Sequence, residues 1–149
     1  MLIQSCTVFN LSILFVSVLY CSVESALPEA QMKAFKKQIK NQCVQKTKID
    51  PAMIEGALNG NFPEDHKFEC FVKCIMDKSL VTTKGRIDWK KIQTTSKAML
   101  PPKLAKKVEA VAAVCKDIEL QEDLCKHAVA ATKCVYENDK ELFKFMNPE

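Results

Sequence analysis

The amino-acid sequence predicts an all-α fold, a bundle of six short helices crosslinked by disulfides. Three observations carry this prediction. Apolar residues recur at helical spacing in several stretches, no stretch alternates as a half-buried strand would, and cysteines are frequent in a chain that carries an export signal. With 149 residues, of which 48% are hydrophobic and 27% charged, the chain can form one domain with a buried core.

Residues 1–25 are predicted to be a secretory signal peptide. They contain no Lys or Arg, and residues 11–20 (LSILFVSVLY) form an apolar run too short to span a bilayer comfortably. We place the cleavage site after Ser25, which leaves 26–149 as the mature domain. An uncleaved membrane anchor is the alternative. The protein is therefore expected to be secreted and extracellular.

Two helices are predicted in the first third of the mature chain. The first, in residues 29–41, follows Pro28 and carries an apolar stripe of Met32, Phe35 and Ile39. The second opens at Asp50 and Pro51, which suit the N-cap and first helical positions. It should end near Leu58, before the turn Asn59-Gly60-Asn61.

A third helix should follow Glu64 and Asp65, because acidic side chains are favourable at a helix N-terminus. Its broad apolar face indicates that it is the most buried helix, and comprises Phe68, Phe71, Val72, Ile75 and Met76. The segment Lys84-Gly85-Arg86 then interrupts the helical pattern.

The remaining helices are marked by caps and prolines. Asp88 can cap a fourth helix that carries Trp89, Ile92 and Met99, and Pro101-Pro102 forces a corner before the fifth. The fifth helix has one apolar stripe of Leu104, Val108, Val111, Ala112 and Cys115, with Lys103, Lys106 and Lys107 facing solvent. The sixth, in residues 121–135, shows Leu124, Ala128, Ala131 and Val135, and a tail with the sequence ELFKFMNPE follows it.

Composition and motifs exclude several classes of function. Gly56, Gly60 and Gly85 are too dispersed for a phosphate-binding loop. Without Glu24 the mature chain has 22 basic and 17 acidic residues, a charge of +5, yet Arg86 is its one arginine, whereas nucleic-acid-binding surfaces favour clustered arginine. Neither H-E-x-x-H nor G-x-S-x-G is present. We expect no nucleic-acid partner, no cofactor and no enzymatic activity.

Six cysteines remain after the signal peptide is removed. Their spacing is C-x26-C-x3-C-x40-C-x9-C-x8-C, and they are Cys43, Cys70, Cys74, Cys115, Cys125 and Cys134. An even number in an exported chain indicates disulfides, for which fifteen pairings are possible. Cys70 and Cys74 lie one helical turn apart with nearly parallel Cβ directions, so each should bond to a different neighbouring element.

Disulfides also make a hollow core possible in so small a domain. Loop-closure entropy gives about 3–4 kcal/mol for each bridge, which can offset the roughly 3–5 kcal/mol lost when a cavity the size of a leucine side chain is left empty. A zinc site of Cys70, Cys74, Cys125 and His127 is the alternative use of these thiols, but its spacing fits no usual motif. We therefore expect no metal site.

The cysteine spacing, together with GNFPED before FECFVKCIMDK, resembles that of the insect odorant-binding and pheromone-binding protein family over essentially the whole mature chain. The resemblance implies six helices around an apolar pocket that carries odorants, pheromones or other lipophilic molecules through aqueous lymph. It also implies that the bridges are Cys43 with Cys74, Cys70 with Cys125, and Cys115 with Cys134.

On this resemblance, we expect an apolar pocket lined by residues of the last three predicted helices: Trp89, Ile92, Leu104, Val108, Val111, Val129 and Ala130. Ordinary core packing is the alternative role for each of them. Phe143, Phe145 and Met146 are too apolar for a free tail and could close the pocket mouth as a lid; a contact with a second copy of the chain is the alternative. If release depends on pH, His66 and His127 are the candidates, although both could be ordinary surface residues.

The sequence thus predicts a secreted carrier of small lipophilic ligands that could deliver them to an odorant receptor. We expect no stable membrane insertion and a monomer or weak homodimer. A cationic host-defence or membrane-active protein is the second hypothesis, since the chain combines positive charge with amphipathic helices.

Overall fold

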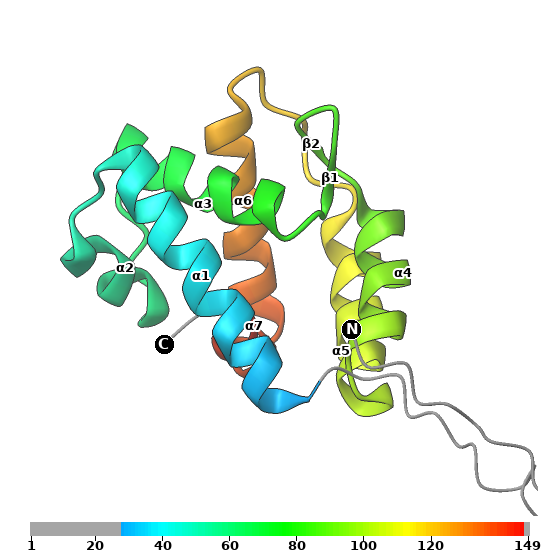
Figure 1. Cartoon of the computed structure of the whole chain (residues 1–149). Helices are drawn as coiled ribbons and strands as arrows, with labels where there is room; N and C mark the ends of the chain where they lie inside the picture. The colour runs from blue at the N-terminus through cyan, green and yellow to red at the C-terminus, as the bar shows by residue number, and fades with distance from the viewer. Residues whose placement is uncertain (1–27, 148–149) are drawn as a thin grey trace, which may run out of the picture.

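The computed structural model describes residues 28–147, and most of these residues lie in α-helices (Figure 1). The predicted signal peptide and its cleavage site lie outside the described residues. The seven helices are α1 (Glu29–Thr47), α2 (Pro51–Leu58), α3 (His66–Lys78), α4 (Trp89–Met99), α5 (Pro102–Cys115), α6 (Leu124–Asn138) and α7 (Lys140–Met146). A small hairpin of β1 (Thr82–Thr83) and β2 (Arg86–Ile87) joins α3 to α4. The prediction of an all-α fold is confirmed.

Several elements differ from the sequence-based expectation: α6 spans Leu124–Asn138 instead of residues 121–135, and residues 82–87 form a short hairpin. Helix α1 continues to Thr47 and ends where Lys48 adopts a left-handed conformation (φ 55°). The expected tail forms α7, a seventh helix directly after α6, because the carboxylate of Asp139 accepts a hydrogen bond from the backbone N–H of Leu142 and so starts a new helix.

Aspartate side chains start most of these helices. In each case a carboxylate oxygen accepts a hydrogen bond from a backbone N–H of the first turn, which would otherwise lack a partner. The five capping residues are Asp50, Asp65, Asp88, Asp123 and Asp139. These aspartates therefore define where five of the seven helices in the described residues begin.

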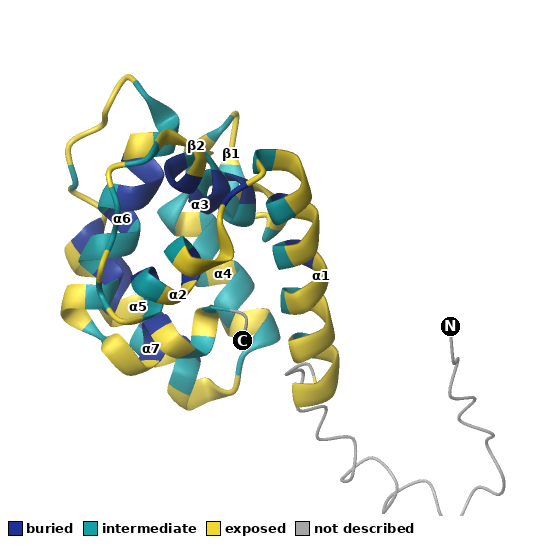
Figure 2. Ribbon diagram, turned by 90° about the vertical axis from the view of Figure 1, so that its left-hand side faces the viewer, coloured by how far each residue is buried: buried dark blue, intermediate teal, exposed yellow. Residues whose placement is uncertain are grey.

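Helices α3 and α6 make the most extensive contact in the molecule, with α1 packed on α3 and α4 packed on α5. In Figure 1, α2 lies on one side of α6 and the α4–α5 pair on the other. The outer face of α1 is largely exposed, whereas α3 and α6 carry many of the buried residues (Figure 2).

The buried apolar residues form two clusters rather than one. The first joins α1, α2, α3 and α6, and includes Ile39, Ile54, Phe68 and Val129. The second joins α5, α6 and α7, with Trp89 and Ile92 of α4 packed against it. The space between these clusters is where the cavity described below lies.

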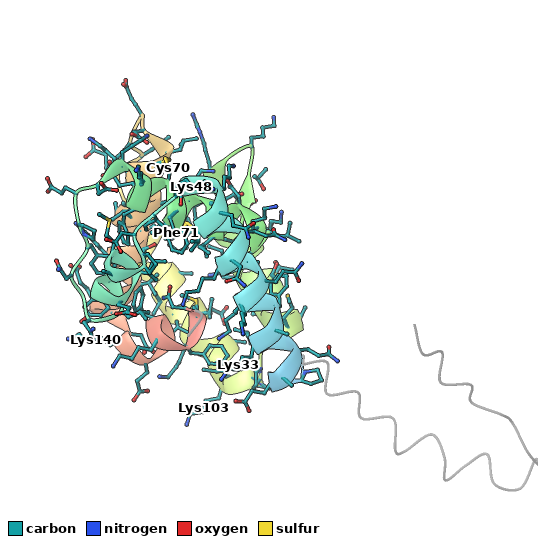
Figure 3. The ribbon with its side chains drawn as sticks, turned by 60° about the vertical axis from the view of Figure 1, so that its left-hand side comes forward. Lys33, Lys48, Cys70, Phe71, Lys103 and Lys140 are labelled. Atoms are coloured by element: carbon teal, nitrogen blue, oxygen red, sulfur yellow. A yellow bond between two sulfur atoms is a disulfide. The ribbon has the colours of Figure 1, made fainter. Side chains whose placement is uncertain are left out.

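Three disulfides crosslink the helices that carry cysteine. They join Cys43 to Cys74, Cys70 to Cys125, and Cys115 to Cys134, the pairs that the family resemblance implies. Figure 3 shows the Cys70 side chain on α3 among the sticks. The sequence separations are 31, 55 and 19 residues, for which loop-closure entropy gives about 3–4 kcal/mol per bridge.

The segment GNFPED connects α2 to α3 and packs against the end of α6. Gly60 has φ +88°, and a Cβ atom there would lie 2.5 Å from the hydroxyl oxygen of Tyr136. The rings of Phe62, Tyr136 and Phe143 pack edge to face, with centroids 5.2–5.9 Å apart. This aromatic group ties the α2–α3 connection to α7.

No helix in residues 28–147 is long and apolar enough to cross a membrane.

Candidate ligand-binding cavity

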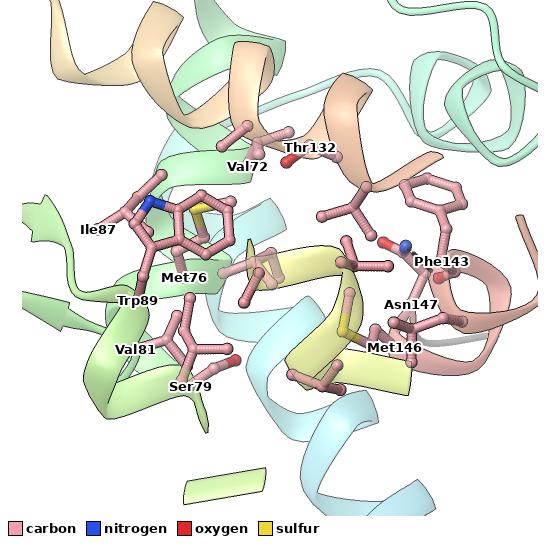
Figure 4. A pocket seen from close by; sticks show the side chains of 18 of the residues that line it. Val72, Met76, Ser79, Val81, Ile87, Trp89, Thr132, Phe143, Met146 and Asn147 are labelled. Atoms are coloured by element: carbon pink, nitrogen blue, oxygen red, sulfur yellow. Dashed lines mark hydrogen bonds between the residues drawn. The ribbon is translucent and has the colours of Figure 1, made fainter. Parts of the chain in front are cut away.

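A cavity of about 190 Å³ lies between the two apolar clusters (Figure 4). Its lining comes from α3, the hairpin, α4, α5, α6 and α7. For comparison, an engineered cavity of about 150 Å³ in another protein binds benzene. The space is therefore large enough for a molecule with one ring or a short chain.

Helix α3 and the hairpin form one wall. Helix α3 contributes Phe71, Val72, Ile75 and Met76. They line the cavity together because residues three and four apart share one face of a helix. Ser79, Val81 and Ile87 follow from the segment after it. In Figure 4, Val81 and Ile87 lie close to the Trp89 end of the pocket.

Helices α4 and α5 form the second wall. Trp89 and Ile92 are one turn apart on α4, and Val108, Val111 and Ala112 are on the buried stripe of α5. Every one of these side chains contributes carbon surface, and Trp89 is the largest of them.

Helices α6 and α7 close the remaining sides. Ala131, Thr132 and Val135 come from α6, and Leu142, Phe143, Met146 and Asn147 come from α7 and its end. In Figure 4, Phe143, Met146 and Asn147 lie at the end of the pocket opposite Trp89. The last helix therefore forms an end wall.

Polar groups are few in the lining. The hydroxyl of Thr132 donates to the carbonyl of Ala128 at 2.8 Å, and the amide of Asn147 donates to the carbonyl of Phe143 at 2.7 Å. Ser79 is the third polar lining residue. Among residues 28–147, no titratable side chain lines the cavity. The cavity therefore offers dispersion and apolar contact, with no acid, base or nucleophilic thiol for catalysis.

The structure brings together four of the seven predicted pocket residues, Trp89, Ile92, Val108 and Val111, in the cavity lining. Leu104 lies one turn before Val108 on the same stripe, beyond the cavity, and lines an outer groove with Met32 and Phe145. The stripe of apolar residues shows which face of the helix is buried, but it does not show where a void ends.

Val129 and Ala130 also lie outside the cavity. They line a surface depression near the start of α3, and Val129 is buried in the cluster with α3. Residues two apart on a helix point in nearly opposite directions, so the α6 face toward the cavity carries Ala131 and Thr132 instead. The lining therefore includes the two residues of α6 that follow the predicted pair.

The side chains predicted as a lid divide between two sides of α7. Phe143 is only 2% exposed and lines the cavity with Met146, whereas Phe145 lines the outer groove. There, Lys36 places its ammonium 4.4 Å from the centre of the Phe145 ring and donates to the Phe145 carbonyl. Labelled lysines such as Lys33 lie at the outside of the molecule in Figure 3.

Lys107 was predicted to face solvent, but in the structure it also forms ion pairs with residues at the start of α7. Its ammonium lies 3.0 Å from Glu141 and 3.2 Å from Asp139, so it connects α5 to the start of α7. Hydrogen bonds to Glu141 and then Asp139 raise the pKa of Lys107. The backbone N–H of Leu142, followed by Lys107, lowers the pKa of Asp139.

The two histidines lie outside the cavity lining. The side chain of His66 is 72% exposed and faces Glu69 and Asp123, whereas His127 is 7% exposed on α6. In the described part of the chain, Nδ1 of His127 has no hydrogen-bond partner. A role for either in pH-dependent release remains a prediction.

Sequence reasoning missed the cavity residues of α3 and the hairpin. The broad apolar face of α3 was recognised as buried, but nothing in its periodicity distinguishes side chains that border a void from side chains in full contact. Val81 directly precedes β1 and Ile87 belongs to β2, and each of these strands has only two residues, too few for an alternating pattern.

The sequence of this chain is similar to those of known proteins. A model of the PBP/GOBP family matches residues 25–138. General odorant-binding protein 72 of Anopheles gambiae is 25% identical over 124 residues, covering 83% of this chain and 100% of the relative. General odorant-binding protein 19d of Drosophila melanogaster is 28% identical over 134 residues, covering 87% of this chain and 89% of the relative.

The fold also matches solved structures. Odorant binding protein 5 of Apis mellifera superposes with a TM-score of 0.72 at 26% sequence identity, covering 78% of this chain and 95% of that protein.

Proposed function

The chain belongs to the PBP/GOBP family, and from that premise we propose that it is a secreted carrier which binds small hydrophobic molecules, such as odorants or pheromones, in its cavity. The observation that carries the proposal is an apolar cavity between two core clusters, lined without a titratable side chain in the described residues. The carrier moves its ligand through aqueous fluid, delivers it to a receptor, and performs no chemistry on it.

The size of the cavity defines the ligand class. A compound of about ten carbon atoms that loses roughly 250 Å² of apolar surface to the cavity gains about 6 kcal/mol from the hydrophobic effect, from which the entropy cost of association is subtracted. Longer ligands require the lining to move. Met76 and Met146 border the space, and methionine side chains adapt readily to a larger guest.

The test is displacement of a fluorescent naphthylamine from the oxidised mature protein by volatile and lipophilic compounds. Val111→Phe should fill the cavity and weaken binding at least tenfold, because Val111 lines the space and is 6% exposed. Val114→Phe is the matched control, since Val114 is on the same helix and 59% exposed.

Retention of secondary structure by circular dichroism shows that both variants fold. Equal affinity in the two folded variants would contradict binding in this cavity.

The lid role is proposed for α7. Phe143 and Met146 form one end of the cavity, so removal of residues 140–149 should speed ligand release. An unchanged release rate would show that ligands leave by another route.

The membrane-active alternative predicts a different result. A host-defence protein would cause leakage from anionic lipid vesicles, whereas a carrier crosslinked through α1, α3, α5 and α6 should leave them intact. Leakage at micromolar protein with no saturable ligand binding would favour the alternative.

A further inference from the structure

A group of potential metal ligands lies on the surface where the start of α3 meets the start of α6. His66 is the first residue of α3, Glu69 follows one turn later, and Asp123 caps α6. His66 Nδ1 is 3.5 Å from Glu69 Oε2 and 3.8 Å from Asp123 Oδ2. One donor atom from each residue lies within 4.8 Å of the other two. An imidazole nitrogen and two carboxylates therefore converge on one point.

The spacing of these atoms suits a small transition-metal ion. Zinc bonds to nitrogen and oxygen of about 2.0–2.2 Å place tetrahedral ligands about 3.3–3.6 Å apart. The two distances from His66 Nδ1, 3.5 and 3.8 Å, are close to that value, so small side-chain rotations would complete the geometry.

Neighbouring contacts orient two of the three ligands. Asp123 uses Oδ1 to accept hydrogen bonds from the backbone N–H groups of Cys125 and Lys126, at 2.8 and 3.4 Å, so its Oδ2 is the oxygen that lies near His66. On the imidazole, Nε2 is 3.6 Å from the sulfur of Cys70, while Nδ1 faces the carboxylates. The Cys70–Cys125 bridge joins α3 to α6 at this place and holds the ligands together before any ion arrives.

Lys126 and Lys133 line the same depression, but within residues 28–147 neither forms an ion pair with Glu69 or Asp123. Glu69 is 8% exposed, and within residues 28–147 its one ion-pair partner is His66. An imidazole nitrogen and two carboxylate oxygens at these distances can all donate lone pairs to one cation. A metal ion satisfies all three groups together.

We propose that His66, Glu69 and Asp123 form a site for a divalent transition-metal ion of the zinc type, with a fourth position open to water. Mixed imidazole and carboxylate ligands favour zinc, nickel and copper over magnesium and calcium. The expectation of no metal site considered thiol ligands, which are in disulfides, and this cluster uses none. None of its residues lines the cavity, so the site is independent of the proposed carrier function.

Calorimetric titration of zinc chloride into the oxidised mature protein tests the proposal. The expected result is one zinc ion per chain, with binding at least tenfold weaker in each of His66→Gln, Glu69→Gln and Asp123→Asn. Asparagine at position 123 keeps a good N-cap, so that variant should fold. Glu64→Gln is the matched control, because Glu64 lines the same depression but is not one of the three ligands, and its affinity should stay within twofold.

Thermal unfolding is a second measurement, and it distinguishes loss of zinc binding from loss of folding. Zinc should raise the midpoint of thermal unfolding of the native chain and of Glu64→Gln, and raise it less in the three ligand variants. Three results would overturn the proposal: no zinc binding at millimolar concentration, calcium binding as tight as zinc, or an equal loss of affinity in Glu64→Gln. The last two would indicate general attraction of cations to acidic groups, and the first would show that the three side chains do not hold an ion.

Discussion

The helices around the cavity are held in two different ways. Cysteines crosslink α1, α3, α5 and α6, which we call the crosslinked frame, whereas α4 and α7 contain no cysteine and are called the free walls. In α4 no residue is fully buried, and α7 is anchored by Leu142, Phe143 and the ion pairs of Lys107. Both free walls contribute cavity lining. From this difference we expect the frame to preserve the fold and the free walls to move when a ligand enters.

The largest effect is expected when the frame is broken. Replacing both Cys70 and Cys125 with serine removes the bridge that closes the longest loop, 55 residues, and should lower the free energy of unfolding by about 4 kcal/mol. The Cys115→Ser/Cys134→Ser pair, with a 19-residue loop, should lose about 3 kcal/mol. Chemical denaturation measures both, and an unchanged unfolding midpoint would show that the frame does not depend on its crosslinks.

Alanine substitutions at two glycines test the packing between the α2–α3 connection, the end of α6 and the free wall α7. Gly60→Ala should destabilise the protein by about 1–3 kcal/mol, because its backbone has φ +88° and the added Cβ would meet the Tyr136 ring that packs on Phe143. Gly56→Ala is the control: it lies inside α2, its added Cβ would have only ordinary contacts at 3.6 Å, and it should stabilise by up to about 1 kcal/mol. Opposite signs in thermal melts are the predicted outcome, and a neutral Gly60→Ala would argue against this tight contact.

The smallest effect concerns pH and the anchoring of α7. The folded-state pKa of Asp139 is lowered from 3.8, so its contribution to stability is complete above that value and is lost as the pH falls through the lowered pKa. We expect α7 to stay in place from pH 7 to about pH 5 and to loosen below about pH 4. Ligand retention measured across this range, with Asp139→Asn for comparison, checks the prediction.

The position of the release step identifies the group responsible. A step below about pH 4 that is altered in Asp139→Asn supports anchoring through Asp139. Release between about pH 7 and pH 5 would contradict it and favour the histidine prediction, His66 or His127.

Much of the fold could be read from the sequence, because its signals are local. Asp50 and Asp88 mark helix starts through their own backbone hydrogen bonds, and Pro102 marks another. The start of α7 was missed although Asp139 provides the same signal, because it follows α6 directly without a polar loop.

The cavity could be predicted only in part, because a void depends on how helices pack. Periodicity shows that Val108 and Val111 face inward, and the structure places both in the lining. The same reasoning predicted Leu104 in the lining, but the cavity does not extend to Leu104, one helical turn before Val108. Which side of α6 faces the space depends on its contact with α3, which no single-helix pattern contains.

The most direct test of two free walls around a crosslinked frame is amide hydrogen exchange, followed by mass spectrometry with and without a saturating ligand. We predict that α4 and α7 exchange faster than α3 and α6 in the free protein, and that ligand slows exchange mainly in α4 and α7. Uniformly slow exchange in the free protein, or equal protection of all helices by ligand, would contradict the account.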